Sequence, residues 1–197
     1  MERECMHNRD SSLDSSYSPG TFPINNNITV KFKEYTYLNL KQIACWPDTL
    51  LQTEDYIKEK LNINSVPDFN KGVINKENSI WRIEPLKWWI LNNELNLPDQ
   101  LGTNLDLSHA FTCINIIGEN ASLLLNRFLP IDLRESVFKE WSSASSAIHH
   151  VSIKLLKISK NNYQLFIPRG FALSIWEILL ESSKQFGYEI LERSQGA

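Results

Sequence analysis

Glycine and cysteine are sparse in this sequence, and both are scattered. The seven glycines form neither a dinucleotide-binding fingerprint nor a phosphate-binding loop, which excludes these two ways of holding a nucleotide. The three cysteines, Cys5, Cys45 and Cys113, lie far apart and are odd in number. This pattern argues against a disulfide framework or a paired-cysteine metal site. It fits a reducing cytoplasm, where we expect the protein to act.

The sequence also lacks an excess of charge and a long apolar run. Twenty Lys and Arg residues against 23 Asp and Glu give a net charge of −3 without a basic stripe, so we expect no nucleic-acid binding. The longest apolar runs, such as 178–180, are far shorter than the roughly 20 residues that span a bilayer. The first 27 residues lack the apolar stretch of a secretory signal. We therefore expect no membrane association.

The composition of the chain changes at about residue 27. Residues 1–27 are rich in Ser, Asn, Asp, Pro and Gly and cannot bury enough apolar surface to offset the entropy of ordering them. We predict a flexible polar arm there; the alternative is an arm that orders on a partner. Residues 28–197 have enough apolar side chains for one domain, or for two small halves that share a core.

The first part of the folded region predicts a mixture of strands and one short helix. Thr53 is a candidate N-cap, and Lys58 and Lys60 lie where a helix dipole favours positive charge. Alternating or β-branched residues predict the strands. The expected elements are strands at 28–33, 38–45, 72–83 and 86–91 and a helix at 53–61. Residues 92–106, which include Pro98 and Gly102, are the expected joint between two halves.

The second part of the folded region has clearer periodicity. Asn161 and Asn162 are suited to a hairpin turn, and Gly187 is suited to a helix C-cap. The expected elements are strands at 111–117, 147–158, 163–167 and 188–191 and helices at 121–128 and 171–186. Their order, β-α-β-β-α-β, is that of a ferredoxin-like unit. We predict an α+β fold of duplicated ferredoxin-like halves, at about 28–91 and 105–192.

Two groups of residues could be interpreted as catalytic or metal-binding. Asp106, Ser108 and His109 supply the residue types of a catalytic triad, but neighbours in an extended segment point apart, which places a nucleophile–base bond out of reach. His149 and His150, if they lie on the strand 147–158, point to opposite faces and cannot share a metal. We interpret all five residues as structural.

One further acidic residue invites a functional interpretation. Asp132 follows Pro130 and could be a ligand-binding acid, but it is better explained as the cap of a turn or of a helix at 133–141. The sequence therefore predicts no catalytic, cofactor-binding or metal-binding residue in this chain.

Tryptophan is abundant for this length, with six residues. Trp176 lies on the apolar face of an expected helix and is predicted to be core. Trp88 and Trp89 are adjacent on an expected strand, so one should face the core and the other outward. An outward tryptophan would favour a protein–protein contact surface, although core packing is the simpler role for any single one.

Three stretches of the sequence carry a resemblance to a known family. Residues 107–110, 130–133 and 168–176, with Gly187, resemble the gamma subunit of heterotetrameric sarcosine oxidase; residues 82–91 do so more weakly. The resemblance implies a fold similar to the folate-binding domain of the glycine-cleavage aminomethyltransferase. It also implies a subunit without a cofactor of its own that packs on the corresponding domain of the alpha subunit, beside beta and delta subunits.

The resemblance further implies the chemistry of a complex rather than of this chain. Such a complex demethylates sarcosine oxidatively to glycine, forms hydrogen peroxide and can pass the one-carbon unit to tetrahydrofolate. Its FAD, covalent FMN, NAD and zinc belong to other subunits. Two alternatives stay open: a free-standing folate-binding module and a regulatory module. The amine that the complex would oxidise is also open.

Overall fold

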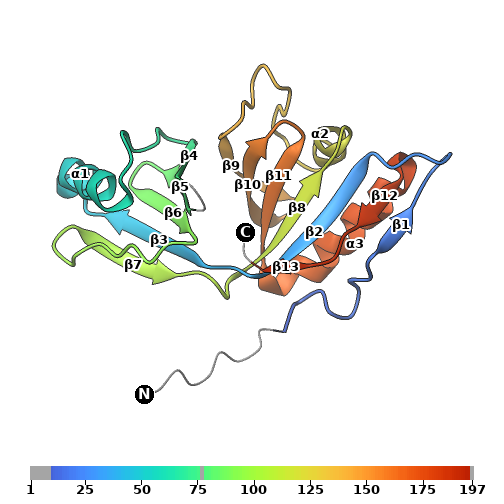
Figure 1. Ribbon diagram of the computed structural model, residues 1–197, viewed down its shortest axis with the longest axis horizontal. Coiled ribbons are helices and arrows are strands. Elements are labelled where there is room, and N and C mark those ends of the chain that lie inside the picture. The colour runs from blue at the N-terminus through green and yellow to red at the C-terminus, as the bar shows by residue number, and fades with distance from the viewer. Residues whose placement is uncertain (1–9, 76–77, 196–197) are drawn as a thin grey trace.

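The computed structural model describes residues 10–75 and 78–195, which form two β-sheets with helices on their outer faces (Figure 1). The strands are β1 (Gly20–Phe22), β2 (Val30–Tyr37), β3 (Leu40–Cys45), β4 (Gly72–Asn75), β5 (Asn78–Glu84), β6 (Lys87–Leu91), β7 (Gly102–Asp106), β8 (Phe111–Ile117), β9 (Ser143–Ile148), β10 (Val151–Ser159), β11 (Asn162–Pro168), β12 (Tyr188–Ile190) and β13 (Ser194–Gln195). The α-helices are α1 (Leu50–Leu61), α2 (Ala121–Leu125) and α3 (Ala172–Ser183), with 3-10 turns η1 (Pro47–Thr49), η2 (Arg169–Phe171) and η3 (Lys184–Phe186). No helix within the described ranges is long and apolar enough to cross a membrane.

The smaller sheet is built from the middle of the chain. Its five strands lie in the order β4-β5-β6-β3-β7, and every pair is antiparallel. Helix α1 packs on one face, where Ile57 joins a cluster that contains Ile43 and Trp88. The helix begins at Leu50 rather than at the expected residue 53, so Thr53 is a buried interior residue and not the N-cap.

The larger sheet has eight strands and repeats the topology of the smaller one. Its order is β1-β12-β2-β8-β11-β10-β9, with β13 added beside β2. In each half the fourth strand (β6 or β11) pairs with the first (β3 or β8), and the last strand (β7 or β12) lies on the first strand's other side. In the larger sheet β2 is inserted between the last strand and the first. The predicted α+β fold of duplicated ferredoxin-like halves is confirmed.

The two sheets pack against each other through their inner faces. Trp89 of the smaller sheet contacts Phe166 and Phe111 of the larger, with ring centroids 5.3 and 5.1 Å apart. The outer face of the larger sheet forms the biggest core with α2 and α3, and it includes Phe32 and Trp176. The layers are therefore helix, sheet, sheet and helices, and both faces of each sheet contribute to a core (Figure 1).

The N-terminal segment differs from the expected flexible arm. Residues 1–9 lie outside the described residues, but from residue 10 the chain packs on the larger sheet and on α3. Leu13 is fully buried, and the ring of Tyr17 stacks on Trp176 with centroids 5.4 Å apart. Strand β1 then pairs with β12. Two apolar side chains therefore anchor this segment on the larger sheet and α3, although its composition is mainly polar.

The sheets also differ from the expected division into halves at 28–91 and 105–192. Strand β2 belongs by position to the first half, yet it lies in the larger sheet between β12 and β8. The expected joint at 92–106 contains a strand, β7, which pairs with β3. Gly102 permits this pairing, because a Cβ there would lie 2.1 Å from the backbone oxygen of Ala44.

The helix expected at 133–141 is wrong. Residues 129–142 form turns held by Lys157, a fully buried side chain of β10. Its ammonium donates hydrogen bonds to the backbone oxygen of Phe138 at 2.6 Å and to Glu135 Oε2 at 2.7 Å. Leu133 and Phe138 of the same segment are buried. The turns therefore pack around the Lys157 side chain, and the segment does not form a helix.

The predicted orientations of the two adjacent tryptophans are half right. Trp88 and Trp89 do face opposite sides of β6, but neither faces solvent: their exposed fractions are 0% and 1%. Trp88 packs under α1, and Trp89 packs between the sheets. The expectation of an outward tryptophan at this position is therefore wrong, because both faces of the sheet are covered.

Candidate functional site

The Asp106, Ser108 and His109 segment connects the smaller sheet to the larger one. The Ser108 hydroxyl accepts a hydrogen bond from Leu40 N at 3.1 Å, and Asp106 Oδ1 accepts one from Ser108 N at 2.8 Å. Hydrogen bonds from the Ser108 hydroxyl and backbone N–H hold the pKa of Asp106 below its usual value. These contacts brace the crossover where the chain passes between sheets, which is a structural role.

The two adjacent histidines form a turn, which corrects their expected place on a strand. Ile148 pairs with Val151, so His149 and His150 are the two loop residues of the hairpin between β9 and β10. His149 has a φ of 53°, and both side chains are exposed. Over residues 10–75 and 78–195, no group of three or more His, Cys, Asp and Glu side chains is placed to hold a metal ion.

Asp132 caps a turn, which is one of the two capping roles predicted for it. Its Oδ1 accepts a hydrogen bond from Arg134 N at 3.1 Å, and its carboxylate also pairs with the Arg134 guanidinium. The hydrogen bonds from Arg134 lower the pKa of Asp132. The carboxylate is committed to its neighbour two residues along the chain.

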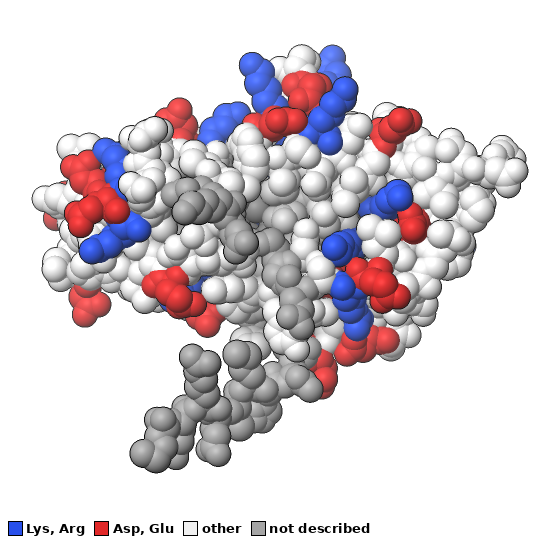
Figure 2. All heavy atoms as spheres, viewed as in Figure 1, with Lys and Arg blue, Asp and Glu red and all other residues white. Residues whose placement is uncertain are grey.

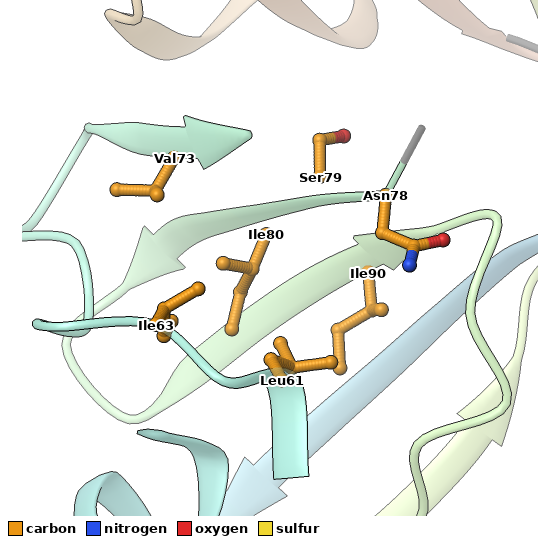
Figure 3. Close-up of a pocket in the computed structure, with 7 residues that line it drawn as sticks. All are labelled: Leu61, Ile63, Val73, Asn78, Ser79, Ile80 and Ile90. Atoms are coloured by element: carbon orange, nitrogen blue, oxygen red, sulfur yellow. The ribbon is translucent and has the colours of Figure 1, made fainter. Parts of the chain in front are cut away.

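Two of the pockets in the described chain illustrate what the surface can hold. One lies between the end of α1 and strands β4 to β6, as Figure 3 shows, and its volume is about 10 Å³, room for one water molecule. Another, of about 510 Å³, lies between the end of α2 and the β9–β10 hairpin. Its lining includes Arg127 and His149 but no serine, cysteine or carboxylate. Neither pocket joins a nucleophile to a base.

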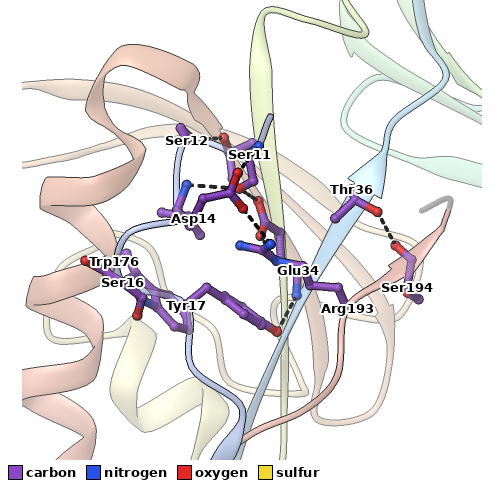
Figure 4. Close-up of polar contacts among 12 residues, drawn as sticks. Ser11, Ser12, Asp14, Ser16, Tyr17, Glu34, Thr36, Trp176, Arg193 and Ser194 are labelled. Carbon is purple, nitrogen blue, oxygen red and sulfur yellow. Dashed lines mark hydrogen bonds and ion pairs between the residues drawn. The ribbon is translucent and has the colours of Figure 1, made fainter. Parts of the chain in front are cut away.

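A buried carboxylate links the two ends of the chain to the larger sheet (Figure 4). Glu34 of β2 is only 2% exposed; it accepts a hydrogen bond from the Ser11 hydroxyl and pairs with Arg193 Nε at 2.8 Å. Arg193 also pairs with Asp14 at 2.6 Å and lies over the ring of Tyr17. Burial raises the pKa of Glu34, and the contacts with Ser11 and Arg193 oppose that rise. No local sequence pattern indicates this cluster, because Glu34 and Arg193 are distant along the chain.

This arrangement predicts how Glu34 contributes to stability as pH changes. Its pKa is higher in the folded than in the unfolded chain, so the folded state takes up the proton first as pH falls. As the pH falls from 7 through the folded-state pKa of Glu34, the free energy of unfolding of the wild-type protein should rise relative to that of Glu34→Gln. Urea denaturation of both proteins at pH 7 and pH 4.5 measures the difference. A difference that stays constant, or that moves toward the variant at the lower pH, contradicts the prediction.

The exposed edge of the smaller sheet is the most distinctive surface feature. Strand β7 ends the strand order, and its residues 103–106 are all exposed. Leu105 is 53% exposed on this strand, and Trp46, at one end of it, is 44% exposed. The Trp46 indole donates a hydrogen bond to Asp99 O at 3.0 Å, so the ring is fixed against the turn that leads into β7.

Comparisons with known proteins show the fold without showing a family. No protein-family description and no curated protein sequence matches the chain. Among solved structures, a chain of the heterotetrameric sarcosine oxidase from Corynebacterium sp. U-96, in complex with pyrrole 2-carboxylate, matches with a TM-score of 0.75 and 14% identity. The match covers 90% of this chain and 96% of that one.

A second solved structure has the same fold in a longer chain. The glycine cleavage system aminomethyltransferase T from Bartonella henselae matches with a TM-score of 0.60 and 8% identity. The match covers 93% of this chain but 57% of that one. The likeness to both proteins that the sequence predicted is confirmed for the fold. At these identities the likeness shows the fold alone.

Proposed function

We propose that this chain is a non-catalytic structural subunit, of the gamma type, in a cytoplasmic heterotetrameric complex similar to sarcosine oxidase. It would pack on the folate-binding domain of an alpha subunit, together with beta and delta subunits. The complex would oxidatively demethylate sarcosine, or a related N-methylated or secondary amine, to the shorter amine, and oxygen would be reduced to hydrogen peroxide. Tetrahydrofolate would accept the one-carbon unit.

The length of the matched sarcosine oxidase chain is the observation that carries this proposal. The match covers nearly all of both chains, so the matched chain of that heterotetramer is about as long as this one. By contrast, the aminomethyltransferase extends well beyond the shared region. A fold shared over nearly the whole length of one chain of a heterotetramer supports a subunit role better than the role of a free-standing enzyme.

The chemistry of the proposed complex would reside in the other subunits. FAD, covalent FMN, NAD and zinc would be held there, and this chain would hold none of them. Its part would be to bury apolar surface of the large subunit; a stable association needs an interface of about 1,600 Å² in total. The fold offers exposed apolar side chains for this purpose, including Trp46, Leu105 and Phe171.

Co-expression tests the proposal directly. We would express the chain alone and with the alpha, beta and delta subunits of a sarcosine oxidase from the same organism, and compare size-exclusion mass, flavin absorbance and peroxide formation. We expect the chain to elute with the yellow complex at one copy per alpha subunit. We also expect omission of the chain to leave the large subunit aggregated or short-lived. An intact, fully active flavoprotein that forms without the chain overturns the proposal.

The same preparation addresses the alternative of a free-standing folate-binding module, which the likeness to aminomethyltransferase T favours. Tetrahydrofolate would be titrated into the isolated chain, followed by calorimetry and by tryptophan fluorescence. Saturable binding by the isolated chain, with no association with the other subunits, would replace the subunit proposal with the folate-module function.

A further inference from the structure

Strand β7 presents an unpaired edge on the outside of the smaller sheet. It pairs with β3 on one side, and no strand among the described residues pairs with it on the other. Leu107 N donates a hydrogen bond to Leu40 O, and Trp46 N donates one to Leu101 O. The backbone N–H and C=O groups of residues 101, 105 and 107 therefore point toward β3. Because the orientation alternates along an antiparallel strand, the backbone groups of Asn104 and Asp106 point outward. Such groups form a ready template for another strand.

The apolar inner layer of the sheet continues to this edge. Cross-strand pairing places Trp81, Trp89, Gln42 and Leu105 in one row on the inner face. The first two are buried between the sheets, whereas Leu105 is half exposed and has no neighbour beyond it in the row among the described strands. An added strand would extend this row by one side chain and would cover Leu105.

The other half of the molecule shows what fills the corresponding position. Strand β12 is the last strand of its half, as β7 is of the smaller sheet, and its outer edge is covered by β1. β1 pairs antiparallel with β12 over Gly20 to Phe22, and Phe22 stacks on Tyr188 with ring centroids 4.7 Å apart. The repeated topology therefore accommodates a short antiparallel strand outside its last strand, and no described strand fills that position in the smaller sheet.

The charge along the β7 edge is negative. Asp48, Asp99 and Asp106 are exposed around it, and the nearest lysine of β3, Lys41, is paired with Glu94 at 2.6 Å. In the view of Figure 2, Asp and Glu side chains lie over the region where Figure 1 places β3 and β7. A strand with basic side chains complements this edge, and an acidic strand is repelled by it.

We propose that the outer edge of β7 is the docking site for an extended, basic strand of another subunit, which pairs antiparallel with residues 102–106 and covers Leu105 and Trp46. This inference rests on the proposed function, because it places the partner strand in a subunit of the same complex. Main-chain hydrogen bonds would supply affinity, and the side chains opposite Leu105 and Asp106 would supply specificity.

Two matched charge variants test this surface in the co-expressed complex. Leu105→Lys places a positive charge where the basic strand would dock, and Leu123→Lys places the same charge on α2 at a leucine of nearly equal exposure, 54%. We expect Leu105→Lys to weaken association with the other subunits by about tenfold or more, since like charges disfavour an interface. Leu123→Lys should associate as the wild type does. Equal urea midpoints of the two isolated variants show that both fold.

Hydrogen exchange supplies a measurement that does not depend on substitution. The amides of Asn104 and Asp106 should exchange at least about tenfold more slowly in the complex than in the isolated chain, because they gain partners there. The docking-site proposal is overturned if Leu105→Lys associates as the wild type does, or if amide exchange over residues 102–106 is unchanged in the complex. Neither result contradicts the proposed subunit function. A wild-type chain that joins no complex overturns both. A homodimer of the isolated chain that Leu105→Lys dissociates assigns the edge to a second copy instead.

Discussion

Replacing Leu13 with alanine should lower the free energy of unfolding by about 2–5 kcal/mol, the range found for large-to-small changes at fully buried positions. Leu13 has no exposed surface and belongs to the core between the larger sheet and its helices. Its backbone oxygen accepts hydrogen bonds from Ser16 N and Tyr17 N, which hold the segment as a turn over that core. Urea denaturation followed by tryptophan fluorescence measures the loss, since Trp176 lies in the same cluster.

An exposed leucine provides the matched control for this substitution. Leu123→Ala removes the same atoms from a side chain that is 54% exposed, and it should change the free energy of unfolding by no more than about 0.5 kcal/mol. If Leu13→Ala and Leu123→Ala have the same denaturation midpoint, residues 10–17 do not belong to the folded core, and the expected flexible arm is restored.

The N-terminal segment shows why composition misled the prediction. Its polar residues do not make it independent of the fold, because Ser11, Asp14 and Tyr17 find their partners at Glu34, Arg193 and Trp176. Those partners are distant in sequence. Leu13 and Tyr17, four residues apart, were the available signal, but two apolar residues among many polar ones predict nothing without the surface that they cover.

Local periodicity succeeded where pairing is local and failed where it is not. The hairpin of β10 and β11 and the helix α3 have clear patterns, and Asn161 and Gly187 do adopt the positive φ that turns and caps require. The insertion of β2 between β12 and β8 joins residues near 30 to residues near 115 and 190, and no local pattern specifies that neighbour. The same limit applies to the edge of β7, which becomes visible only when the strand order is known.

The junction between the sheets gives the second large expected effect, from the substitution Gly72→Ala. A Cβ at Gly72 would lie 2.4 Å from Cε3 of Trp81, closer than side chains approach one another. The Trp81 ring cannot withdraw, because it is fully buried and packs on Trp141 with centroids 5.7 Å apart. The backbone is fixed as well, since Gly72 N donates a hydrogen bond to Trp141 O at 2.8 Å. We expect a loss of about 1–3 kcal/mol, as for other overpacked cores.

Two further variants separate this clash from a general effect of removing glycine. At Gly170 an added Cβ meets nothing within 4 Å. Gly170→Ala should therefore leave the free energy of unfolding unchanged or raise it by up to about 1 kcal/mol, because alanine lowers the conformational entropy of the unfolded chain. The second is Trp81→Leu, combined with Gly72→Ala. If the clash is the cause, the double variant should be more stable than the sum of the two single changes predicts, by about 0.5–3 kcal/mol. Additive losses would mean that the cost of Gly72→Ala comes from the backbone at position 72 and not from a clash with Trp81. The close approach of the Trp81 ring would then not explain the need for glycine at this position.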